Sequence, residues 1–327
     1  MVMDKQNERQ VEALDLITIG ETMVLFEPFD DGTIQYSGAF HKRIGGAESN
    51  VAIGLSKLGH SVSWVSRLGD DPFGRYIHAY VRGEGVDVSQ VKFDSSASTG
   101  IYFKEKGSFN QTLVHYYRKQ SAASNMKPGD LEEGLIKKAK YLHITGITPA
   151  LSTSCHQTIL HAVKVAKENG VKIIFDPNLR KKVWGEVDYI PIMKELIRQS
   201  DYFLPGTEEL HDLFPKRNVK GIIEELLDQV EAVVLKKGAE GASYHTKEES
   251  SEVNGYPNDQ VKDPVGAGDG FATGFISGLL DGLTLYDSIK RANLIGSMVT
   301  MVKGDCEGLP SRKELLSFTK NTRDVQR

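Results

Sequence analysis

The sequence predicts an α/β fold of three layers, in which helices cover both faces of a mostly parallel central sheet and a small β-sheet forms a lid. Two observations predict this fold. After about residue 140, short apolar segments alternate with helical patterns, which is typical of a parallel sheet. Between residues 99 and 118, two segments with strand-like alternation flank a turn and predict a β-hairpin. Since no helical pattern accompanies that hairpin, we expect a separate small sheet that serves as a lid.

The first third of the chain is expected to supply strands to both sheets. Leu14–Gly20 is an apolar segment that ends at a glycine and predicts the first strand, and Met23–Phe29 predicts a second one. A helix is expected after Gly46, because apolar residues recur at positions 51, 55 and 58. His60–Leu68 predicts the next strand. We expect the lid strands to come from about residues 22–45 and 97–119.

The strands expected after residue 140 are short and apolar. Tyr141–Thr145 predicts a strand, and Cys155–Asn169 predicts the helix that follows it. Further strands are expected at Val171–Phe175, Tyr202–Leu204 and Ala232–Leu235. Because these segments are apolar throughout, they are expected to be buried on both faces. No linker or repeat divides the chain, so we expect a single domain over residues 1–327.

Composition and charge exclude several classes of protein. The 327 residues include 40 Lys and Arg against 44 Asp and Glu, and a net charge of −4 argues against nucleic acid as the main ligand. No apolar run approaches the roughly 20 residues that cross a bilayer, and the N-terminus is too polar for a signal peptide. Cys155 and Cys306 are too far apart to indicate a disulfide framework or a zinc site. We therefore expect a cytoplasmic protein without nucleic-acid or membrane partners.

The strongest signal for chemistry is Asp263–Phe275, which reads DPVGAGDGFATGF. Gly266 and Gly268 let backbone N–H groups approach a ligand closely, and we expect Gly268 to need a positive φ angle. The apolar residues that follow recur every four positions and predict a buried helix. A glycine-rich loop that opens a helix is an anion site, because its unpaired amides and the helix dipole both favour negative charge.

Asp269 lies in the first turn of that helix, beside the expected anion site. A carboxylate there would repel a phosphate, but it makes sense as a general base that takes a proton from an attacking hydroxyl. The alternative is an aspartate that only caps a structural helix, and the spacing alone does not decide between the two. The chain has no Walker A loop, and no GxGxxG fingerprint follows its first strand, which argues against hydride transfer.

Two motifs together resemble the signatures of the ribokinase-like (PfkB) sugar kinases. Asp263–Phe275 is similar to the C-terminal signature and Gly45–Ala52 (GGAESNVA) to the N-terminal one, in the expected order and separation. The similarity covers roughly residues 14–318 and implies the ribokinase-like fold. Within the family, segments such as Asp176–Arg180 (DPNLR) and Gly304–Gly308 (GDCEG) resemble the branch that phosphorylates 2-keto-3-deoxygluconate.

The resemblance implies a role for each matching residue. Asp269 matches the catalytic base, and Gly266, Ala267 and Gly268 match the anion hole. The substrate-binding residues that it implies are Gly46, Ala47, Glu48, Ser49, Asn50, Tyr102, Tyr116, Tyr117, Arg118 and Arg180. The nucleotide-binding residues that it implies are Asn178, Arg180, Lys236, Gly238, Gly241, Gly266, Gly268 and Asn293.

ATP and Mg²⁺ are the implied cofactors, and the resemblance points to Glu209 for the metal. The wider family carries an Asn-x-x-Glu motif at this place, whereas Gly206 replaces the asparagine here. The branch that acts on 2-keto-3-deoxygluconate often lacks the asparagine too.

The implied reaction is the ATP-dependent phosphorylation of 2-keto-3-deoxygluconate, a sugar acid. Arg118, next to Tyr116 and Tyr117, suits a polyol that ends in a carboxylate, and Arg180 adds a second positive charge. Two alternatives stay open: a kinase of the same fold for a neutral sugar (fructose or ribose) or a nucleoside, and a sugar sensor without activity. Because the lid sheet has open edges, a homo-oligomer that pairs two lids is a further expectation.

Overall fold

The structure is a computed structural model that describes residues 13–30, 33–107 and 111–325. Within these residues, the body contains a nine-stranded sheet in the order β13-β12-β11-β10-β9-β8-β1-β4-β5. Its strands are β1 (Leu14–Ile19), β4 (Val62–Gly69), β5 (Val91–Asp94), β8 (Ala139–Thr145), β9 (Lys172–Asp176), β10 (Tyr202–Phe203), β11 (Ala232–Lys236), β12 (Gly241–His245) and β13 (Ser250–Asn254). Neighbouring strands are parallel from β11 to β5, whereas β12 pairs antiparallel with both β11 and β13.

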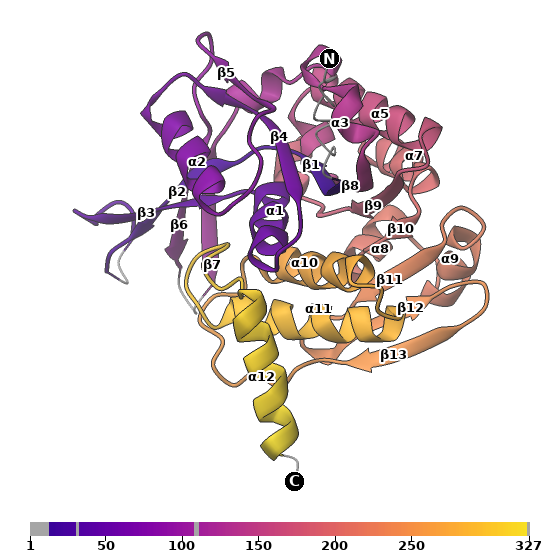
Figure 1. Ribbon diagram of the computed structural model, residues 1–327. Helices are drawn as coiled ribbons and strands as arrows, with labels where there is room; N and C mark the ends of the chain where they lie inside the picture. Colours follow the sequence, from indigo (N-terminus) through magenta and orange to yellow (C-terminus); the bar gives the residue numbers. More distant parts are fainter. Residues whose placement is uncertain (1–12, 31–32, 108–110, 326–327) are drawn as a thin grey trace, which may run out of the picture.

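A second sheet stands apart from the body at the left of Figure 1 and forms the lid. Its order is β3-β2-β6-β7, with β2 (Met23–Pro28), β3 (Phe40–Gly45), β6 (Ile101–Lys106) and β7 (Thr112–Tyr117). The pairs β2–β3 and β6–β7 are antiparallel, and β2–β6 is parallel. The expected hairpin is therefore present as β6 and β7, although residues 108–110 of its turn lie outside the described residues.

Helices cover both faces of the body sheet. They are α1 (Ala47–Lys57), α2 (Pro72–Gly83), α3 (Glu133–Ile136), α4 (Thr148–Leu151), α5 (Thr153–Glu168), α6 (Lys181–Trp184), α7 (Ile190–Gln199), α8 (Thr207–Leu213), α9 (Val219–Leu226), α10 (Ala267–Leu280), α11 (Leu285–Thr300) and α12 (Arg312–Val325). Successive side chains of a strand point to opposite faces. Leu16 of β1 accordingly packs in the core that contains α1, α10 and α11, whereas its neighbour Ile17 packs in the core that contains α5, α7 and α9. This alternation confirms the three-layer prediction.

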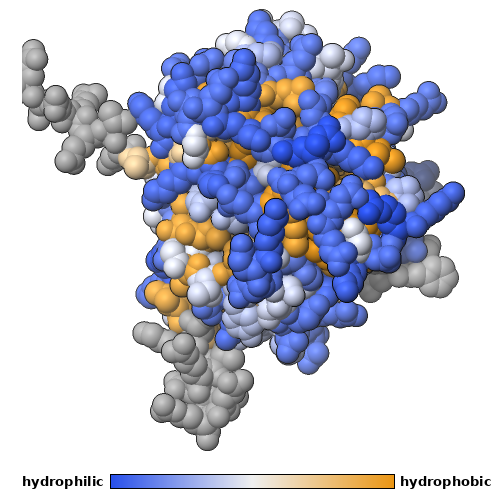
Figure 2. Space-filling model, turned by 90° about the vertical axis from the view of Figure 1, so that its right-hand side faces the viewer, coloured by the Kyte–Doolittle hydropathy of each residue, from blue (hydrophilic) through white to orange (hydrophobic). Residues whose placement is uncertain are grey.

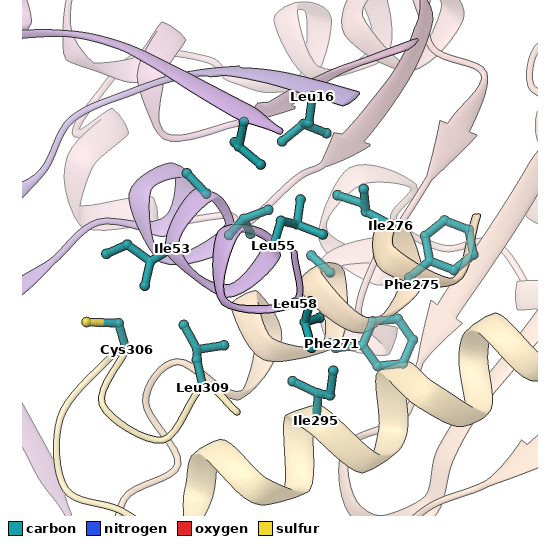
Figure 3. Close-up of a cluster of buried hydrophobic side chains, with 14 of the residues drawn as sticks. Leu16, Ile53, Leu55, Leu58, Phe271, Phe275, Ile276, Ile295, Cys306 and Leu309 are labelled. Carbon is teal, nitrogen blue, oxygen red and sulfur yellow. The ribbon is translucent and has the colours of Figure 1, made fainter. Parts of the chain in front are cut away.

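The packing of α10 against α1 and α11 fixes the start of α10. Figure 3 shows Leu58, the C-cap residue of α1, close to Phe271 of α10, with Leu55 of α1 and Phe275 of α10 in the same cluster. All four side chains are buried, and burying each one contributes about 1.5–3 kcal/mol. A Cβ at Gly274 would lie only 2.6 Å from the Cα of α11 residue Ala292, so glycine allows the two helices to approach closely. The first turn of α10 is thus held rigidly over the end of the sheet.

Some elements were missed by the sequence analysis. The antiparallel edge formed by β12 and β13 lies where polar and charged residues interrupt the apolar pattern. The segment after Gly69 begins α2, with Asp71 as its N-cap, accepting from the N–H of Gly74, and with Pro72 at the first position. No helix among the described residues is long and apolar enough to cross a membrane. Figure 2 shows a face on which hydrophilic residues predominate and apolar residues form small groups.

Candidate active site

The candidate site lies at the carboxyl ends of the parallel strands, the edge at which open α/β sheets bind ligands. Thr145 ends β8, Asp176 ends β9 and Lys236 ends β11, while Glu21 follows β1 closely. Two neighbouring cavities open there and have Arg180 and three other lining residues in common, Val265, Gly266 and Asp269.

The first cavity, here called the body cavity, has a volume of about 300 Å³. It is lined by Asp176, Asn178, Arg180, Glu209, Lys236, Pro264, Val265, Gly266, Gly268 and Asp269. The second, here called the lid cavity, has a volume of about 110 Å³ and lies between the lid and the start of α1. Its lining includes Glu21, Gly46, Ala47, Glu48, Asn50, Tyr102, Lys104, Tyr116, Arg118, Arg180, Asp269 and Asp305.

The start of α10 brings Gly266 and Gly268 to the body cavity, whereas Ala267 does not line it and donates its N–H to the carbonyl of Pro264 at 3.4 Å. Gly266 is the N-cap of α10 with φ +84°, and a Cβ there would collide with the carbonyl oxygen of Asp305. Gly268 has no positive φ, so the expectation for its backbone was wrong: it lies inside the helix, where the chain takes right-handed angles. A Cβ on Gly268 would meet nothing within 4 Å. The space in front of this glycine is therefore open to an anion, which the helix start favours.

Asp269 lies where the two cavities meet, and two amides hold its carboxylate. Asn50 donates from Nδ2 to Oδ2 at 2.7 Å, and Asn178 donates from Nδ2 to Oδ1 at 3.4 Å. Burial raises the pKa of Asp269 to about 7, although the Asn50 hydrogen bond and the positive charge of Arg180 act in the opposite direction. A carboxylate with a pKa near neutrality is suited to general base catalysis.

The floor of the body cavity carries a buried ion pair. Lys236 donates from Nζ to both oxygens of Asp176, at 2.9 and 2.8 Å. Burial would lower the pKa of Lys236, but the charges of Asp176 and Glu209 outweigh it and raise that pKa, so the ammonium group stays positive. Glu209 accepts backbone N–H groups on both oxygens, from Leu179 and Gly206, at 2.7 Å each. Glu209 thereby caps α8 and holds the loop after β9.

The chain presents no metal cage at this site. Among the residues that the structure describes, no group of three or more His, Cys, Asp or Glu could hold a metal ion. The two cavity carboxylates of Asp176 and Glu209 already have partners on both oxygens. A role of Glu209 in organising Mg²⁺ stays a prediction.

One wall of the lid cavity is built around Glu21 and Arg118. Arg118 donates from Nε to Oε2 of Glu21 at 2.7 Å and also pairs with it through Nη2, while Ser121 donates to Oε1 at 2.5 Å. The Glu21 side chain is 1% exposed and that of Arg118 is 9% exposed. The ring of Tyr116 lies 5.5 Å from the guanidinium carbon. Arg118 is therefore held in place, and Glu21 occupies only part of its five N–H donors.

Glu48 offers an unpaired acceptor at the bottom of the lid cavity. Its Oε1 accepts the hydroxyl groups of Thr145 and Thr148, at 2.6 and 2.8 Å. Its Oε2 is buried and has no partner among the described residues, and burial raises the pKa of this carboxyl group. Buried polar atoms normally have a partner, so the free oxygen is suited to a ligand hydroxyl.

Arg180 is the exposed cation of the site. It begins α6 as its N-cap residue and lines both cavities. Its guanidinium forms no hydrogen bond or ion pair with another described residue. It is consequently free to bind an anionic ligand.

Several residues implied by the resemblance do not reach the cavities. Tyr117 is 66% exposed and packs against Phe103 on the outer face of the lid, because adjacent residues of β7 point to opposite faces. Ser49 donates its hydroxyl to the carbonyl of Gly46 within α1. Three further residues, Gly238, Gly241 and Asn293, line neither cavity.

These last residues have structural surroundings of their own. Gly238 lies in the turn before β12 and Gly241 begins that strand, and they take positive φ angles of 60° and 108°. Asn293 on α11 donates to the carbonyl groups of Val253 and Asn254 at the end of β13. Conversely, sequence reasoning missed Glu21 as a site residue, although an acidic residue just past the first strand was a usable signal.

Comparison with known proteins decides the family. The sequence profile of the pfkB family of carbohydrate kinases matches residues 13–312. The chain belongs to this family. The PfkB assignment agrees with the fold, since the body sheet and the separate lid sheet are those that the resemblance implied.

Two curated relatives are similar to this PfkB protein over nearly its whole length. A 2-dehydro-3-deoxygluconokinase of Bacillus subtilis is 38% identical over 95% of this chain and 97% of its own. A 2-dehydro-3-deoxygluconokinase of Thermoproteus tenax is 34% identical over 94% of this chain and 95% of its own.

Two solved structures have the same fold. A PfkB protein of Polaromonas is 40% identical with a TM-score of 0.85, covering 93% of this chain and 100% of its own. A ribokinase II of E. coli in complex with ATP and Mg²⁺ is 25% identical with a TM-score of 0.88, covering 94% of this chain and 99% of its own.

Proposed function

We propose that this PfkB protein catalyses the ATP-dependent phosphorylation of 2-keto-3-deoxygluconate, also called 2-dehydro-3-deoxygluconate, on its O6 hydroxyl. The observation that carries the proposal is the position of Asp269. Its carboxylate lies where an anion-binding helix start meets a second cavity that contains a buried arginine. Two relatives that are 38% and 34% identical bear the name of this activity, which supports the same substrate.

In the proposed reaction, Asp269 accepts the proton of the O6 hydroxyl as that oxygen attacks the γ-phosphorus of ATP. The bond between this phosphorus and the oxygen bridging to ADP breaks, and the phosphoryl group passes to O6. Backbone N–H groups at Gly266 and Gly268, which line the body cavity, stabilise the charge on the phosphoryl oxygens. Lys236 and Arg180, which also line the body cavity, add positive charge beside the phosphates.

The body cavity suits the phosphates of ATP, because the space in front of Gly268 in the first turn of α10 is open. The E. coli ribokinase II structure with ATP and Mg²⁺ supports both cofactors in this fold. Mg²⁺ usually keeps several water molecules and binds through substrate phosphates with one or two carboxylates. We expect the ion to enter with the nucleotide, since the described residues contain no cage for it.

The lid cavity is suited to a sugar acid. Arg180 is unpaired and Arg118 keeps free N–H donors, so a substrate carboxylate meets two guanidinium groups. The free oxygen of Glu48 and the ring of Tyr116 suit the hydroxylated carbon chain. A neutral sugar would leave Arg180 without a counter-charge, whereas Arg118 keeps Glu21. A cytoplasmic location and a homo-oligomer through the lid stay predictions.

A coupled assay of ADP release with purified wild type and Asp269→Asn tests the proposal. Asparagine keeps the size of the side chain but cannot accept the proton. We expect Asp269→Asn to fold and bind ATP, while kcat falls by about 10²–10⁴-fold. If the variant keeps more than about a tenth of wild-type kcat, Asp269 is not the base, because general base catalysis is worth more than that.

A further inference from the structure

Lys104 is a buried lysine on the inner face of the lid sheet. It is 2% exposed and ranks among the largest fully buried side chains of the described residues. Strand β6 alternates between its two faces, so Tyr102 and Lys104 share the face that borders the lid cavity, whereas Phe103 lies on the other face. An ammonium group is costly to bury unless it is paired, so this position requires partners on the body.

Two aspartates of the body supply these partners. Lys104 donates from Nζ to Asp263 Oδ2 at 2.6 Å and to Asp305 Oδ1 at 3.1 Å. The other two oxygens are also engaged, because Tyr102 donates its hydroxyl to Asp305 Oδ2 at 2.6 Å and Val265 donates its N–H to Asp263 Oδ1 at 3.1 Å. Every carboxylate oxygen of this network therefore has a donor.

The network reaches the backbone that forms the anion hole. Asp263 begins the loop that leads to α10, and its carboxylate holds the N–H of Val265, one residue before Gly266. The carbonyl oxygen of Asp305 lies so close to Gly266 that a Cβ there would collide with it. One ammonium group thus joins the lid strand β6 to both segments that shape the start of α10.

We infer that Lys104 is a positioning residue for phosphoryl transfer. Through its two aspartate partners, it couples the position of the lid sheet to the geometry of the anion hole. The inference rests on the proposed function, since it assigns Lys104 a part in that same reaction. A misplacement of about 1 Å at a reacting centre can cost about 10²-fold in rate, so a loose loop at Gly266 lowers kcat. Lys104 also borders the lid cavity, where a direct contact with substrate would instead raise the KM of the sugar acid.

The test compares Lys104→Met with Lys106→Met, a matched control two residues further along β6. Lys106 is exposed, so its loss removes a lysine from the same strand without touching the network. Hydrogen–deuterium exchange without substrate measures the amides of residues 265–268. We expect at least tenfold faster exchange there in Lys104→Met and no change in Lys106→Met. This measurement does not depend on catalytic activity. A negative result would therefore contradict the role of Lys104 without bearing on the proposed function.

Kinetics supply the second readout. In Lys104→Met we expect kcat to fall about 10–100-fold, while the KM values for ATP and the sugar acid stay within threefold. Lys104→Met leaves two buried carboxylates without a counter-charge, so its stability also falls. The double variant Lys104→Met/Asp263→Asn removes one of these charges. We expect it to recover thermal stability but not kcat, because the link between lid and loop is still missing.

Three results would overturn the inference. Unchanged exchange at residues 265–268 would show that Lys104 does not hold the loop. A wild-type kcat in the double variant would show that Lys104 only stabilises the fold. The same conclusion would follow if Lys104→Met lowered Tm but kept wild-type kcat. A raised KM for the sugar acid at unchanged kcat would make Lys104 a direct substrate contact.

Discussion

At the scale of single residues, the ionisation of Asp269 sets the pH range of the reaction. The pKa of this carboxyl group is raised to about 7 by burial, and only the ionised form accepts a proton. We therefore expect kcat/KM to fall about tenfold per pH unit below pH 7 and to level off above it. Asn50→Ala removes a hydrogen bond that lowers this pKa, so the fall should begin at a higher pH. A pH profile from 5 to 8.5 that is flat, or that moves to lower pH in the variant, contradicts the role of Asp269.

The two site arginines differ in what their removal costs. Arg118→Leu leaves Glu21 buried and without its counter-charge, which costs about 3–5 kcal/mol of stability and obscures any effect on binding. Arg180 is exposed and pairs with no described residue, so Arg180→Leu should change Tm little. We expect Arg180→Leu to lower kcat/KM for the sugar acid by about tenfold or more, since a charge-assisted hydrogen bond is worth about 1.5–3 kcal/mol. Equal kcat/KM in wild type and variant would remove Arg180 from substrate recognition.

At the scale of elements, the two glycines at the start of α10 have different roles: Gly268 leaves space for a ligand, whereas Gly266 takes a backbone angle that favours glycine. Gly268→Val should fold well, because its Cβ meets open space and valine is at least as good as glycine within a helix. The new side chain occupies the space of the phosphate, so kcat/KM for ATP should fall at least tenfold.

Gly266→Val is the matched variant, since it forces a β-branched residue into a φ of +84° against the carbonyl of Asp305. We expect a clearly lower Tm for it, and thermal unfolding of both variants tests the contrast. Normal kcat/KM for ATP in Gly268→Val would contradict the anion hole.

How well the elements could be predicted depended on their apolar patterns. β1, β8 and β9 are buried on both faces, so continuous apolar runs marked them within one or two residues. Strand β13 alternates exposed and buried positions and contains serine and glutamate, so no such run marks it. The N-terminus of α10 was predictable from its glycines, but which glycine takes a positive φ was not, because it depends on where the helix begins: Gly266 is the N-cap and Gly268 lies inside the helix.

At the scale of the whole molecule, the site joins segments that are far apart in the sequence. Asn50 and Asp269 are separated by 219 positions, and Lys104 and Asp263 by 159. Sequence motifs indicated Asn50 and Asp269 one by one, because each belongs to a recognisable signature. No local pattern indicates the pairing of Arg118 with Glu21 or that of Lys104 with Asp263. These pairs form only when the lid docks on the body, and they decide which arginine is free for substrate.

The most direct test of the proposed substrate is the ratio of kcat/KM for 2-keto-3-deoxygluconate to that for fructose, measured by ADP release from the wild-type enzyme. Fructose offers no carboxylate to Arg180 or to the N–H donors of Arg118 that Glu21 leaves free. A charge-assisted hydrogen bond from each of the two arginines is worth about 1.5–3 kcal/mol, and each 1.4 kcal/mol is about tenfold. We predict a ratio of about 10² or more in favour of the sugar acid. Equal kcat/KM on both substrates would contradict the sugar-acid assignment and indicate a kinase for neutral sugars.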